Sequence, residues 1–174
     1  MRTLVHLSDL HFGRVDEKLL APLRACIEGI DPDVVVVSGD LTQRAKSEQF
    51  EAAREYLDTL PGPQIIVPGN HDISLYNVFR RFIKPLARYK RFITDDLSPS
   101  FVDDEIAVIG VNTARSLTIK DGRVNKEQVA EIRAQLAGID KNVVKIVVTH
   151  HPFDLPQGQD DDDLVDRAPM AMQA

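Results

Sequence analysis

Short runs of apolar, mostly β-branched residues alternate along the chain with segments of helical periodicity. Such alternation is typical of a layered α/β domain with a largely parallel sheet. The second run is apolar without interruption, which indicates a strand covered on both faces. Five runs are predicted to be strands: Thr3–Leu7, Val34–Val37, Gln64–Val67, Ile106–Val111 and Val143–Val148.

Two of the intervening segments carry clear helix signals. Between residues 47 and 60, apolar residues recur on one face at helical spacing, with charged residues elsewhere. That face consists of Phe50, Ala53, Leu57 and Leu60. Further along, Asn125 followed by Gln128 resembles a capping box for a helix that Gly138 would end. Both segments are therefore predicted to be helices.

Prolines complicate two further helical segments. Pro22 lies inside segment 16–29, and because an interior proline removes a helical hydrogen bond, this helix is predicted to begin at Pro22. The helical pattern of segment 73–91 is expected to be kinked or broken near Pro85. The last segment, 157–174, contains four consecutive aspartates and no periodic pattern, so it is predicted to be acidic and loop-like.

Three of the predicted strands end in polar motifs that could bind a metal. In order they are Asp9-Leu10-His11, Gly39-Asp40 and Gly69-Asn70-His71-Asp72. Taken singly, each could be an ordinary turn. Ligands of open α/β sheets, however, bind at the carboxyl ends of strands, where all three motifs lie. Carboxylate and amide oxygens combined with imidazole suit divalent first-row metals such as Mn²⁺, Fe²⁺ or Zn²⁺, and glycines let the backbone approach such a metal closely.

The composition narrows the possible functions. The 174 residues include 21 basic and 27 acidic ones, and the net charge of −6 argues against binding nucleic acid or an anionic membrane by bulk charge. The one cysteine, Cys26, cannot form an internal disulfide, so a reducing cytoplasm is the expected location. No apolar run approaches about 18 residues, and polar residues come early in the chain, so we expect neither a membrane span nor a signal peptide.

The three motifs, together with His150 after the last predicted strand, resemble the first four sequence blocks of the calcineurin-like metallophosphoesterases. The resemblance runs from residue 4 to about residue 153 and points to the branch of bacterial cyclic-nucleotide phosphodiesterases. It implies a four-layer α/β/β/α sandwich over residues 1–156, with two sheets facing each other and helices outside. It also implies a hydrolase that uses two divalent metal ions.

The resemblance implies a set of metal ligands. The first metal would bind Asp9 and His11, and Asp40 would bridge both metals. Asn70 and His150 would bind the second metal. Two metals about 3.5–4 Å apart can clamp a phosphoryl group and activate a water. The main hypothesis is therefore in-line attack on phosphorus by a hydroxide that bridges the two metals.

The resemblance also implies a catalytic pair, His71 and Asp72. His71 would stabilise the transition state or protonate the leaving group, with Asp72 orienting it. A histidine that is not a metal ligand can donate a proton to a leaving alkoxide, and an adjacent carboxylate can fix its tautomer.

The chain departs from the family pattern near its end. Members of the family have a Gly-His-x-His block downstream, which supplies one further histidine to each metal. None of the nine glycines here is followed by histidine, and no histidine follows His151. We therefore expect a truncated member whose second sheet lacks its C-terminal part. Such a chain should bind metal more weakly than a longer one and expose a strand edge that could pair in a homodimer.

The sequence thus predicts a cytoplasmic, metal-dependent phosphoesterase. Its substrate is expected to be a small phosphodiester, cyclic-nucleotide-like by resemblance, or a phosphomonoester. Phospholipid head-group diesters and nucleic-acid ends are alternatives, and the overall acidity weakens the second of these. A hypothesis of a different class is a catalytically weak fold that serves as a binding or scaffold module.

Some other polar residues have structural interpretations beside functional ones. His6, inside the first predicted strand, is interpreted as a core histidine rather than a metal ligand. His151 could face the substrate or support the metal ligands, and Asn112 could reach the cleft or form a turn. The basic residues of segment 80–91 are expected to form a solvated helix face, although they could also attract a phosphate.

Overall fold

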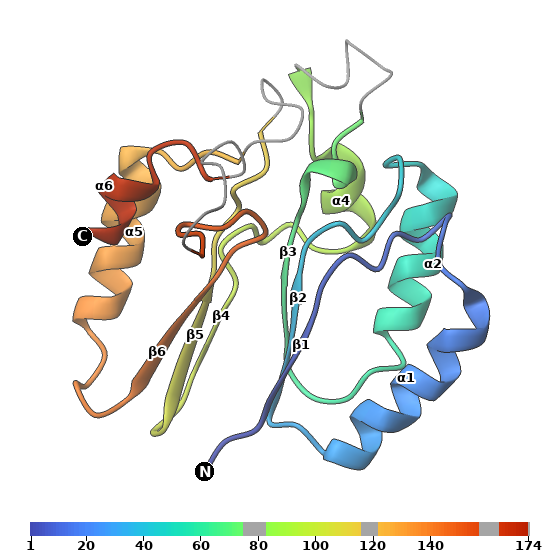
Figure 1. Ribbon diagram of the computed structural model, residues 1–174, viewed down its shortest axis with the longest axis horizontal. Coiled ribbons are helices and arrows are strands. Elements are labelled where there is room, and N and C mark those ends of the chain that lie inside the picture. Colours follow the sequence, from blue (N-terminus) through green and yellow to red (C-terminus); the bar gives the residue numbers. More distant parts are fainter. Residues whose placement is uncertain (75–82, 116–121, 157–163, 174) are drawn as a thin grey trace.

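In the residues that it describes, the computed structural model contains two three-stranded sheets that face each other (Figure 1). It describes residues 1–74, 83–115, 122–156 and 164–173. The first sheet is parallel and consists of β1 (Leu4–Leu7), β2 (Val34–Ser38) and β3 (Gln64–Val67), in that order. The second consists of β4 (Ser100–Val102), β5 (Ile106–Gly110) and β6 (Val144–Val148). In it, β5 pairs antiparallel with β4 and parallel with β6.

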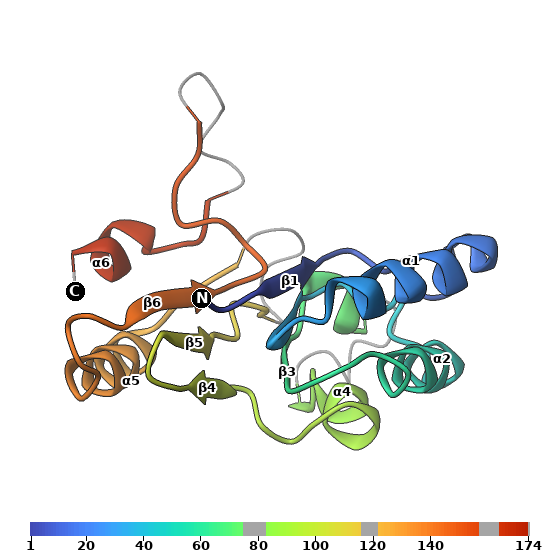
Figure 2. The same cartoon turned by 90° about the horizontal axis from the view of Figure 1, so that it is seen from below.

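Helices cover the outer faces of both sheets. The first sheet is covered by α1 (Glu17–Ile30), α2 (Ser47–Leu57) and α4 (Ala87–Phe92). The second is covered by α5 (Lys126–Ala137) and the short α6 (Ala168–Met172). A 3-10 turn, η1 (Asn70–Asp72), follows β3. Seen from below, the layers follow one another as helices, sheet, sheet and helices, which confirms the predicted four-layer sandwich (Figure 2).

Alternating residues of the central strands pack into two separate cores. One face of the first sheet packs on the second sheet through Val34, Val36, Ile65, Val67, Ile106, Val108 and Val148. The other face packs on the helices through Val35, Val37, Ile66, Ile27, Phe50 and Tyr89. Because β2 is covered on both faces, all of its residues are buried, as its uninterrupted apolar run predicts.

Helix α1 begins earlier than predicted. It starts at Glu17, so the interpretation of Pro22 as its first residue is wrong. The carboxylate of Asp16 accepts a hydrogen bond from Lys18 N (3.1 Å) and so caps the helix start. Pro22 lies on the exposed side, where water can satisfy the carbonyl that loses its helical partner. The buried Ile27 on the opposite side anchors the helix to the core.

The other predicted elements agree with the structure, with two additions. The capping box of α5 is confirmed, because Asn125 Oδ1 accepts a hydrogen bond from Gln128 N (2.7 Å) and Gln128 Oε1 accepts one from Asn125 N (3.2 Å). The predicted break near Pro85 is confirmed by the start of α4 two residues later. Residues 75–82 of that segment lie outside the described residues. The additions are β4 and α6, so the chain beyond residue 156 is not loop-like throughout.

The outer edge of β6 has no strand partner among the described residues. On this strand Val144 is 59 % exposed and Val147 is 39 % exposed. An edge that exposes apolar side chains agrees with the expected strand edge, whereas dimerisation stays a prediction. At the edge of the first sheet, His6 is exposed and hydrogen bonded through Nε2 to Ser38 Oγ (2.6 Å), so its interpretation as a core residue is wrong.

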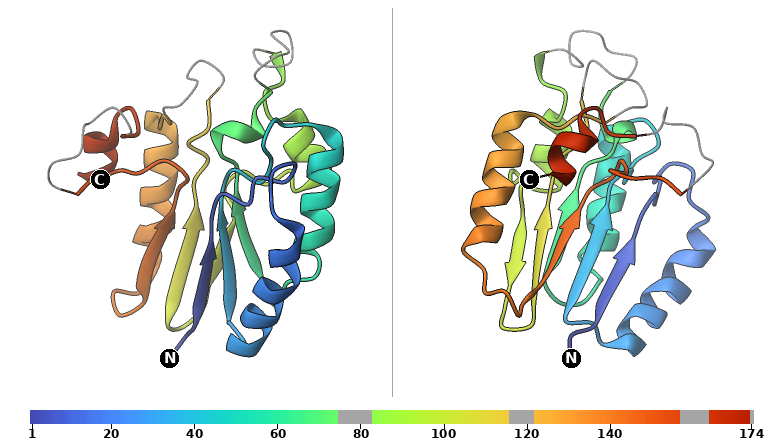
Figure 3. Two further views of the ribbon diagram at one scale, coloured as in Figure 1. Left: turned by 45° about the vertical axis from the view of Figure 1, so that its right-hand side comes forward. Right: turned by 60° about the vertical axis from the view of Figure 1, so that its left-hand side comes forward.

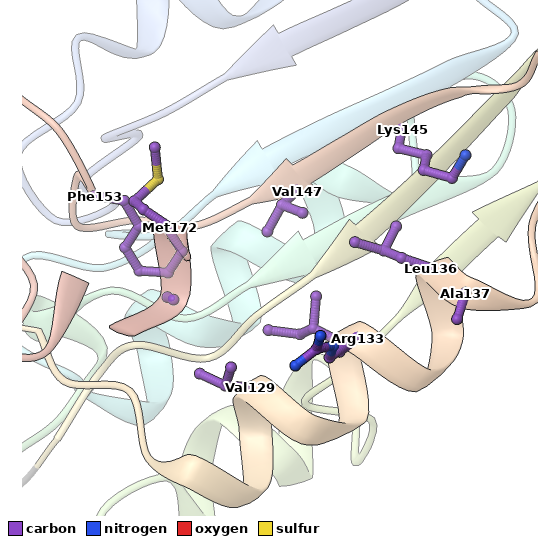
Figure 4. A pocket seen from close by; sticks show the side chains of 10 residues that line it. Val129, Arg133, Leu136, Ala137, Lys145, Val147, Phe153 and Met172 are labelled. Carbon is purple, nitrogen blue, oxygen red and sulfur yellow. The ribbon is translucent and has the colours of Figure 1, made fainter. Parts of the chain in front are cut away.

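An apolar pocket of about 480 Å³ lies between α5, α6 and β6 (Figure 4). Its lining includes Val129 and Leu136 of α5, Val147 of β6, and Phe153 and Met172 from the following chain. It contains none of the predicted metal ligands. Within the described chain, we find no helix with the length and apolar character that crossing a membrane requires.

Candidate active site

The carboxyl ends of the parallel strands lie at one end of the molecule (Figure 3), and the predicted site residues directly follow them. Asp9 follows β1 by two residues, Asp40 follows β2 by two, and Asn70 follows β3 by three. His150 follows β6 by two residues and so brings the second sheet to the same site. The carboxyl ends of β1, β2, β3 and β6 lie toward the top of Figure 1, and polar side chains that follow them form one cluster.

Three of these residues have an unusual backbone conformation. The φ angles of Asp9, His11 and Asp40 are 57°, 46° and 52°, in the left-handed region that non-glycine residues seldom adopt. Backbone hydrogen bonds between the two loops hold this conformation, since Asp9 N donates to Gly39 O (3.2 Å) and His11 N donates to Asp40 O (2.9 Å). Such conformations cost of order 1–3 kcal/mol each and concentrate at functional sites.

Asp40 lies at the centre of the cluster and is only 4 % exposed. Its Oδ1 lies 3.4 Å from His150 Nε2, and its Oδ2 lies 3.8 Å from His11 Nε2. His11 Nε2 is in turn 3.5 Å from Asp9 Oδ1. The backbone N–H of His71 donates to Asp40 Oδ1 (2.9 Å) and fixes the carboxylate. Asp40 thus presents one oxygen to each side of the cluster.

Around His150, several acceptor atoms approach one another. His150 Nδ1 lies 2.7 Å from the carbonyl oxygen of Ser38, and because a carbonyl only accepts hydrogen bonds, Nδ1 carries the proton. In the neutral ring Nε2 is then an acceptor, yet it lies 3.1 Å from Asn70 Oδ1 and 3.4 Å from Asp40 Oδ1. Three converging acceptors need a positive charge between them, and a metal ligand held by a hydrogen bond on its other nitrogen has this arrangement.

Two glycines leave the space that the cluster needs. A Cβ at position 39 would lie 2.6 Å from His150 Nδ1. A Cβ at position 69 would overlap both Oδ1 and the backbone N of Asp40. Gly39 and Gly69 therefore allow the backbone to approach two predicted ligands closely, His150 and Asp40.

The donor atoms fall into two groups, each compact enough to hold a metal ion. One group contains Asp9, Asp40 and His150, and the other contains His11, Asp40 and His71, with the ligand atoms of each group within 4.8 Å of one another. The two groups share Asp40, as a bridging ligand would. Carboxylate oxygen and imidazole nitrogen are the donors that divalent first-row metals prefer, so these residues fit such ions.

The imidazole of His71 is oriented by Gln43 rather than by the predicted Asp72. His71 Nδ1 lies 2.8 Å from the carbonyl oxygen of Gln43, so Nδ1 carries a proton. The side-chain amide of Gln43 is also near, with Nε2 at 3.3 Å from the same nitrogen. The ring of His71 also makes an edge contact with the ring of His11, with centroids 4.9 Å apart.

The carboxylate of Asp72 instead joins the loops beneath the site. It is buried and accepts hydrogen bonds from the backbone N–H groups of Gly69 (3.0 Å), Leu41 (3.2 Å) and Thr42 (2.9 Å). Burial, with a smaller contribution from the nearby carboxylate of Asp40, raises the pKa of Asp72 to about 6 against the effect of these hydrogen bonds. The described contacts of this carboxylate do not include the His71 imidazole, which corrects its predicted role.

Two residues that the sequence analysis did not single out belong to this arrangement. Thr42 is fully buried, and its hydroxyl lies 3.0 Å from Asp72 Oδ1 and 3.2 Å from the carbonyl oxygen of His71. Gln43 contributes the carbonyl that fixes the His71 ring. Both come directly after Asp40 and Leu41, so the polar residues that continue the strand-end motif were the available signal.

The remaining candidates lie around the site with structural contacts. His151 is buried, and its Nδ1 lies 2.8 Å from Thr113 Oγ1. Asn112 Oδ1 accepts a hydrogen bond from Ala114 N (3.0 Å), which favours its interpretation as a turn residue. Of the basic segment, Arg88 donates to the carbonyl oxygen of Ala45 (2.5 Å). Part of that segment, residues 80–82, lies outside the described residues, and its attraction for a phosphate stays a prediction.

Comparison with known proteins identifies relatives of this architecture. The chain is 28 % identical over 91 % of its length to glycerophosphodiester phosphodiesterase GpdQ of Enterobacter lignolyticus. It is 24 % identical over 89 % of its length to the 3',5'-cyclic adenosine monophosphate phosphodiesterase CpdA of Escherichia coli K12. The match covers 60 % of the first relative and 56 % of the second, so the chain spans less than two thirds of the length of these curated relatives.

A solved structure supports the fold. The crystal structure of phosphopantetheinyl hydrolase PptH from Mycobacterium tuberculosis matches with a TM-score of 0.50 at 19 % sequence identity, over 87 % of this chain and 68 % of that chain. The family profile described as calcineurin-like phosphoesterase matches residues 2–170, nearly the whole sequence. With the strand-end motifs, the facing sheets and this match in agreement, the chain belongs to the calcineurin-like phosphoesterase family.

Proposed function

We propose that this chain is the metal-dependent catalytic part of a phosphoesterase that hydrolyses small phosphodiesters. Phosphodiesterase relatives at modest identity support a diester over a phosphomonoester, and among diesters they include enzymes named for glycerophosphodiesters and for cyclic AMP. The observation that carries the proposal is the placement of Asp40, whose Oδ1 lies 3.4 Å from His150 Nε2 and whose Oδ2 lies 3.8 Å from His11 Nε2.

Two divalent ions would be held by the residues on either side of this carboxylate. Asp9 and His11, with Oδ1 and Nε2 3.5 Å apart, are proposed to bind the first ion, Asn70 and His150 the second, and Asp40 both. This division differs from the two compact groups of donor atoms, which place Asp9 with His150 and His71 with His11. Ions held there would supply positive charge for the phosphoryl oxygens and acidity that activates water. Ser38 supports the second group, because its carbonyl fixes the His150 ring with Nε2 free for a metal.

His71 is proposed to assist the leaving group. Its Nδ1 proton is held by the Gln43 carbonyl, so Nε2 is the atom that can gain and release a second proton. In the imidazolium form, Nε2–H would donate to the leaving oxygen as its bond to phosphorus breaks, which avoids expulsion of a free alkoxide. Thr42 and Asp72 act indirectly, because they hold the backbone on which His71 lies.

The experiment combines metal binding with turnover. Titration calorimetry with Mn²⁺ should detect binding that Asp40→Asn weakens at least tenfold, because the shared ligand loses its charge. Hydrolysis of bis(4-nitrophenyl) phosphate in Mn²⁺ should fall about a hundredfold in His71→Gln, while Mn²⁺ binding stays within a few-fold of the original. Asp95→Asn, an exposed carboxylate away from the cluster, is the matched control and should change neither quantity.

Each outcome separates the hypotheses. Mn²⁺ binding without turnover of bis(4-nitrophenyl) phosphate or of 4-nitrophenyl phosphate would contradict the enzyme and favour a binding module. Faster turnover of the monoester would contradict the preference for diesters. Turnover that persists undiminished in Asp40→Asn, with metal removed by chelation, would contradict the metal dependence.

A further inference from the structure

Arg14 lies beside the proposed site, and its side chain has no structural partner in the described part of the chain. Its side chain is exposed and lines a pocket of about 470 Å³ together with Asp9, His11, Gln43 and His71. Among the described residues its guanidinium makes no ion pair and no hydrogen bond. This differs from Arg2, Arg54 and Arg123, which pair with carboxylates on the same molecule. The guanidinium of Arg14 is therefore available to an anionic ligand.

The backbone that carries Arg14 is held firmly. Its N–H donates to the carbonyl oxygen of His11 (2.8 Å), which closes a turn directly after that proposed ligand. Phe12, two residues before Arg14, is hydrogen bonded to the neighbouring loop. Its N–H donates to Leu41 O (2.8 Å), and its carbonyl accepts from Gln43 N (3.0 Å). A fixed backbone lowers the entropy that is lost when a ligand is bound, so contacts made from this turn favour binding.

The position of His71 indicates which part of a substrate would enter this pocket. His71 lines the same pocket, and under the proposed function it serves the leaving group. The leaving group would therefore occupy the space between His71 and Arg14. The side-chain amide of Gln43 lies on the same wall and adds a polar group to the pocket.

From this arrangement we infer that Arg14 is a specificity-determining residue, which binds an anionic group, a carboxylate or phosphate, on the leaving group of the substrate. The inference rests on the proposed function, because it uses His71 to locate the leaving group. The chain carries a net charge of −6, so its overall field repels a substrate with a second negative charge. A bidentate contact from Arg14 offsets that repulsion where the ligand is bound.

Two matched diesters test the inference. Methyl 4-nitrophenyl phosphate and methyl 3-carboxy-4-nitrophenyl phosphate differ only by one carboxylate on the leaving group. We expect Arg14→Gln to lower the ratio of kcat/KM for the carboxylated diester over the neutral one by about tenfold, the size typical of one lost charge-assisted contact. Arg14→Lys, which keeps the charge but loses the bidentate fork, should lower the ratio less.

The control is Arg133→Gln, an exposed arginine on α5 that lies in the apolar pocket of Figure 4, away from the site. It should leave the ratio of the two diesters unchanged. A ratio that does not change in Arg14→Gln, or that changes equally in Arg133→Gln, would overturn the assignment of Arg14.

A binding measurement separates this inference from the proposed function. The released phenol, 5-hydroxy-2-nitrobenzoate, should bind to the protein in equilibrium dialysis, and Arg14→Gln should weaken that binding about tenfold relative to 4-nitrophenol. If neither diester is hydrolysed but this difference is observed, the proposed function fails and the anion pocket stands. If both diesters are hydrolysed and the difference is absent, the anion pocket fails and the proposed function stands.

Discussion

Thr42 connects His71, the proposed catalytic histidine, to the rest of the molecule. Its hydroxyl accepts a hydrogen bond from Ala45 N (3.0 Å) and lies within hydrogen-bond distance of Asp72 and of the His71 carbonyl. We expect Thr42→Val to lower the free energy of unfolding by about 1–3 kcal/mol, because buried partners lose the hydroxyl in a side chain of the same shape. Urea unfolding monitored by circular dichroism measures this change.

The matched control for this change is Thr42→Ser, which keeps the hydroxyl and loses only a methyl group. It should retain more of the stability than Thr42→Val does. If the valine variant is as stable as the original protein, or the serine variant is the less stable of the two, the hydroxyl does not hold the loop.

A second prediction for a single residue concerns Gly69. A Cβ at this position would overlap the backbone and carboxylate of Asp40, and neither can move without disturbing the cluster. Gly69→Ala should therefore destabilise the fold by more than about 1 kcal/mol. Gly29, inside α1, has nothing within 4 Å of its Cβ position, so Gly29→Ala should stabilise by about 0.5–1 kcal/mol. Thermal unfolding of both variants tests the contrast, and equal effects would refute it.

The sequence predicts the site best where side chains that can bind a metal directly follow a predicted strand. Asp40 is predicted from the motif that ends its strand, whereas His150 is predicted as a ligand from the family resemblance, and both follow strands whose carboxyl ends meet at the site. The role of Gln43 could not be predicted, since it depends on a backbone carbonyl, which every residue has. The prediction that His6 is a core residue is wrong, because its position within a strand does not reveal whether the facing sheet covers the side chain.

Among the elements, α1 shows how packing overrides local propensity. Its interior Pro22 lacks the N–H that would bond to Lys18 O, yet the helix continues because Ile27 and its neighbours are buried against the first sheet.

Pro22→Ala should restore the hydrogen bond to Lys18 O and raise the free energy of unfolding by up to about 3 kcal/mol. Pro22→Gly restores the same N–H in a flexible residue and should gain about 1 kcal/mol less. Urea unfolding compares them, and destabilisation by alanine would contradict this account.

The sequence pattern does not predict β4, the shortest of the described strands. β4 has three residues, of which only Phe101 is even half-buried, so neither length nor alternation distinguishes it from a loop. It forms because its pairing with β5 is closed by a turn in which Asp103 Oδ1 accepts hydrogen bonds from Glu105 N and Ile106 N (both 2.8 Å). Periodicity within the strand does not predict such an element, because the pairing with β5 and the turn at Asp103 specify it.

For the molecule as a whole, periodicity predicts an α/β chain but not two sheets. The facing arrangement is implied by the family resemblance, and one apolar cluster that includes Val36 and Ile65 of the first sheet and Val108 of the second accounts for it. Both sheets bury one face against the other, which aligns the carboxyl ends of β1, β2, β3 and β6 around one site. The fold thus explains why two proposed ligands separated by 110 residues, Asp40 and His150, meet.

The open edge of the second sheet gives a prediction for the whole molecule in solution. Val144 is 59 % exposed on β6, whose outer edge has no partner in the described part of the chain. An exposed apolar edge favours pairing with another chain, so the protein should self-associate at high concentration. Val144→Lys should reduce this association, because an edge charge opposes strand pairing, and it should leave the thermal unfolding temperature nearly unchanged because the side chain is exposed.

Sedimentation velocity over a concentration series measures this association. Leu19→Lys is the matched control, since Leu19 is 62 % exposed on α1 and receives the same charge away from any sheet edge. If both lysine variants reduce association equally, net charge rather than the edge of β6 is responsible. A protein that stays monomeric at all concentrations would show that the β6 edge is protected despite its exposed valines, by its twist or by charges nearby such as Lys145.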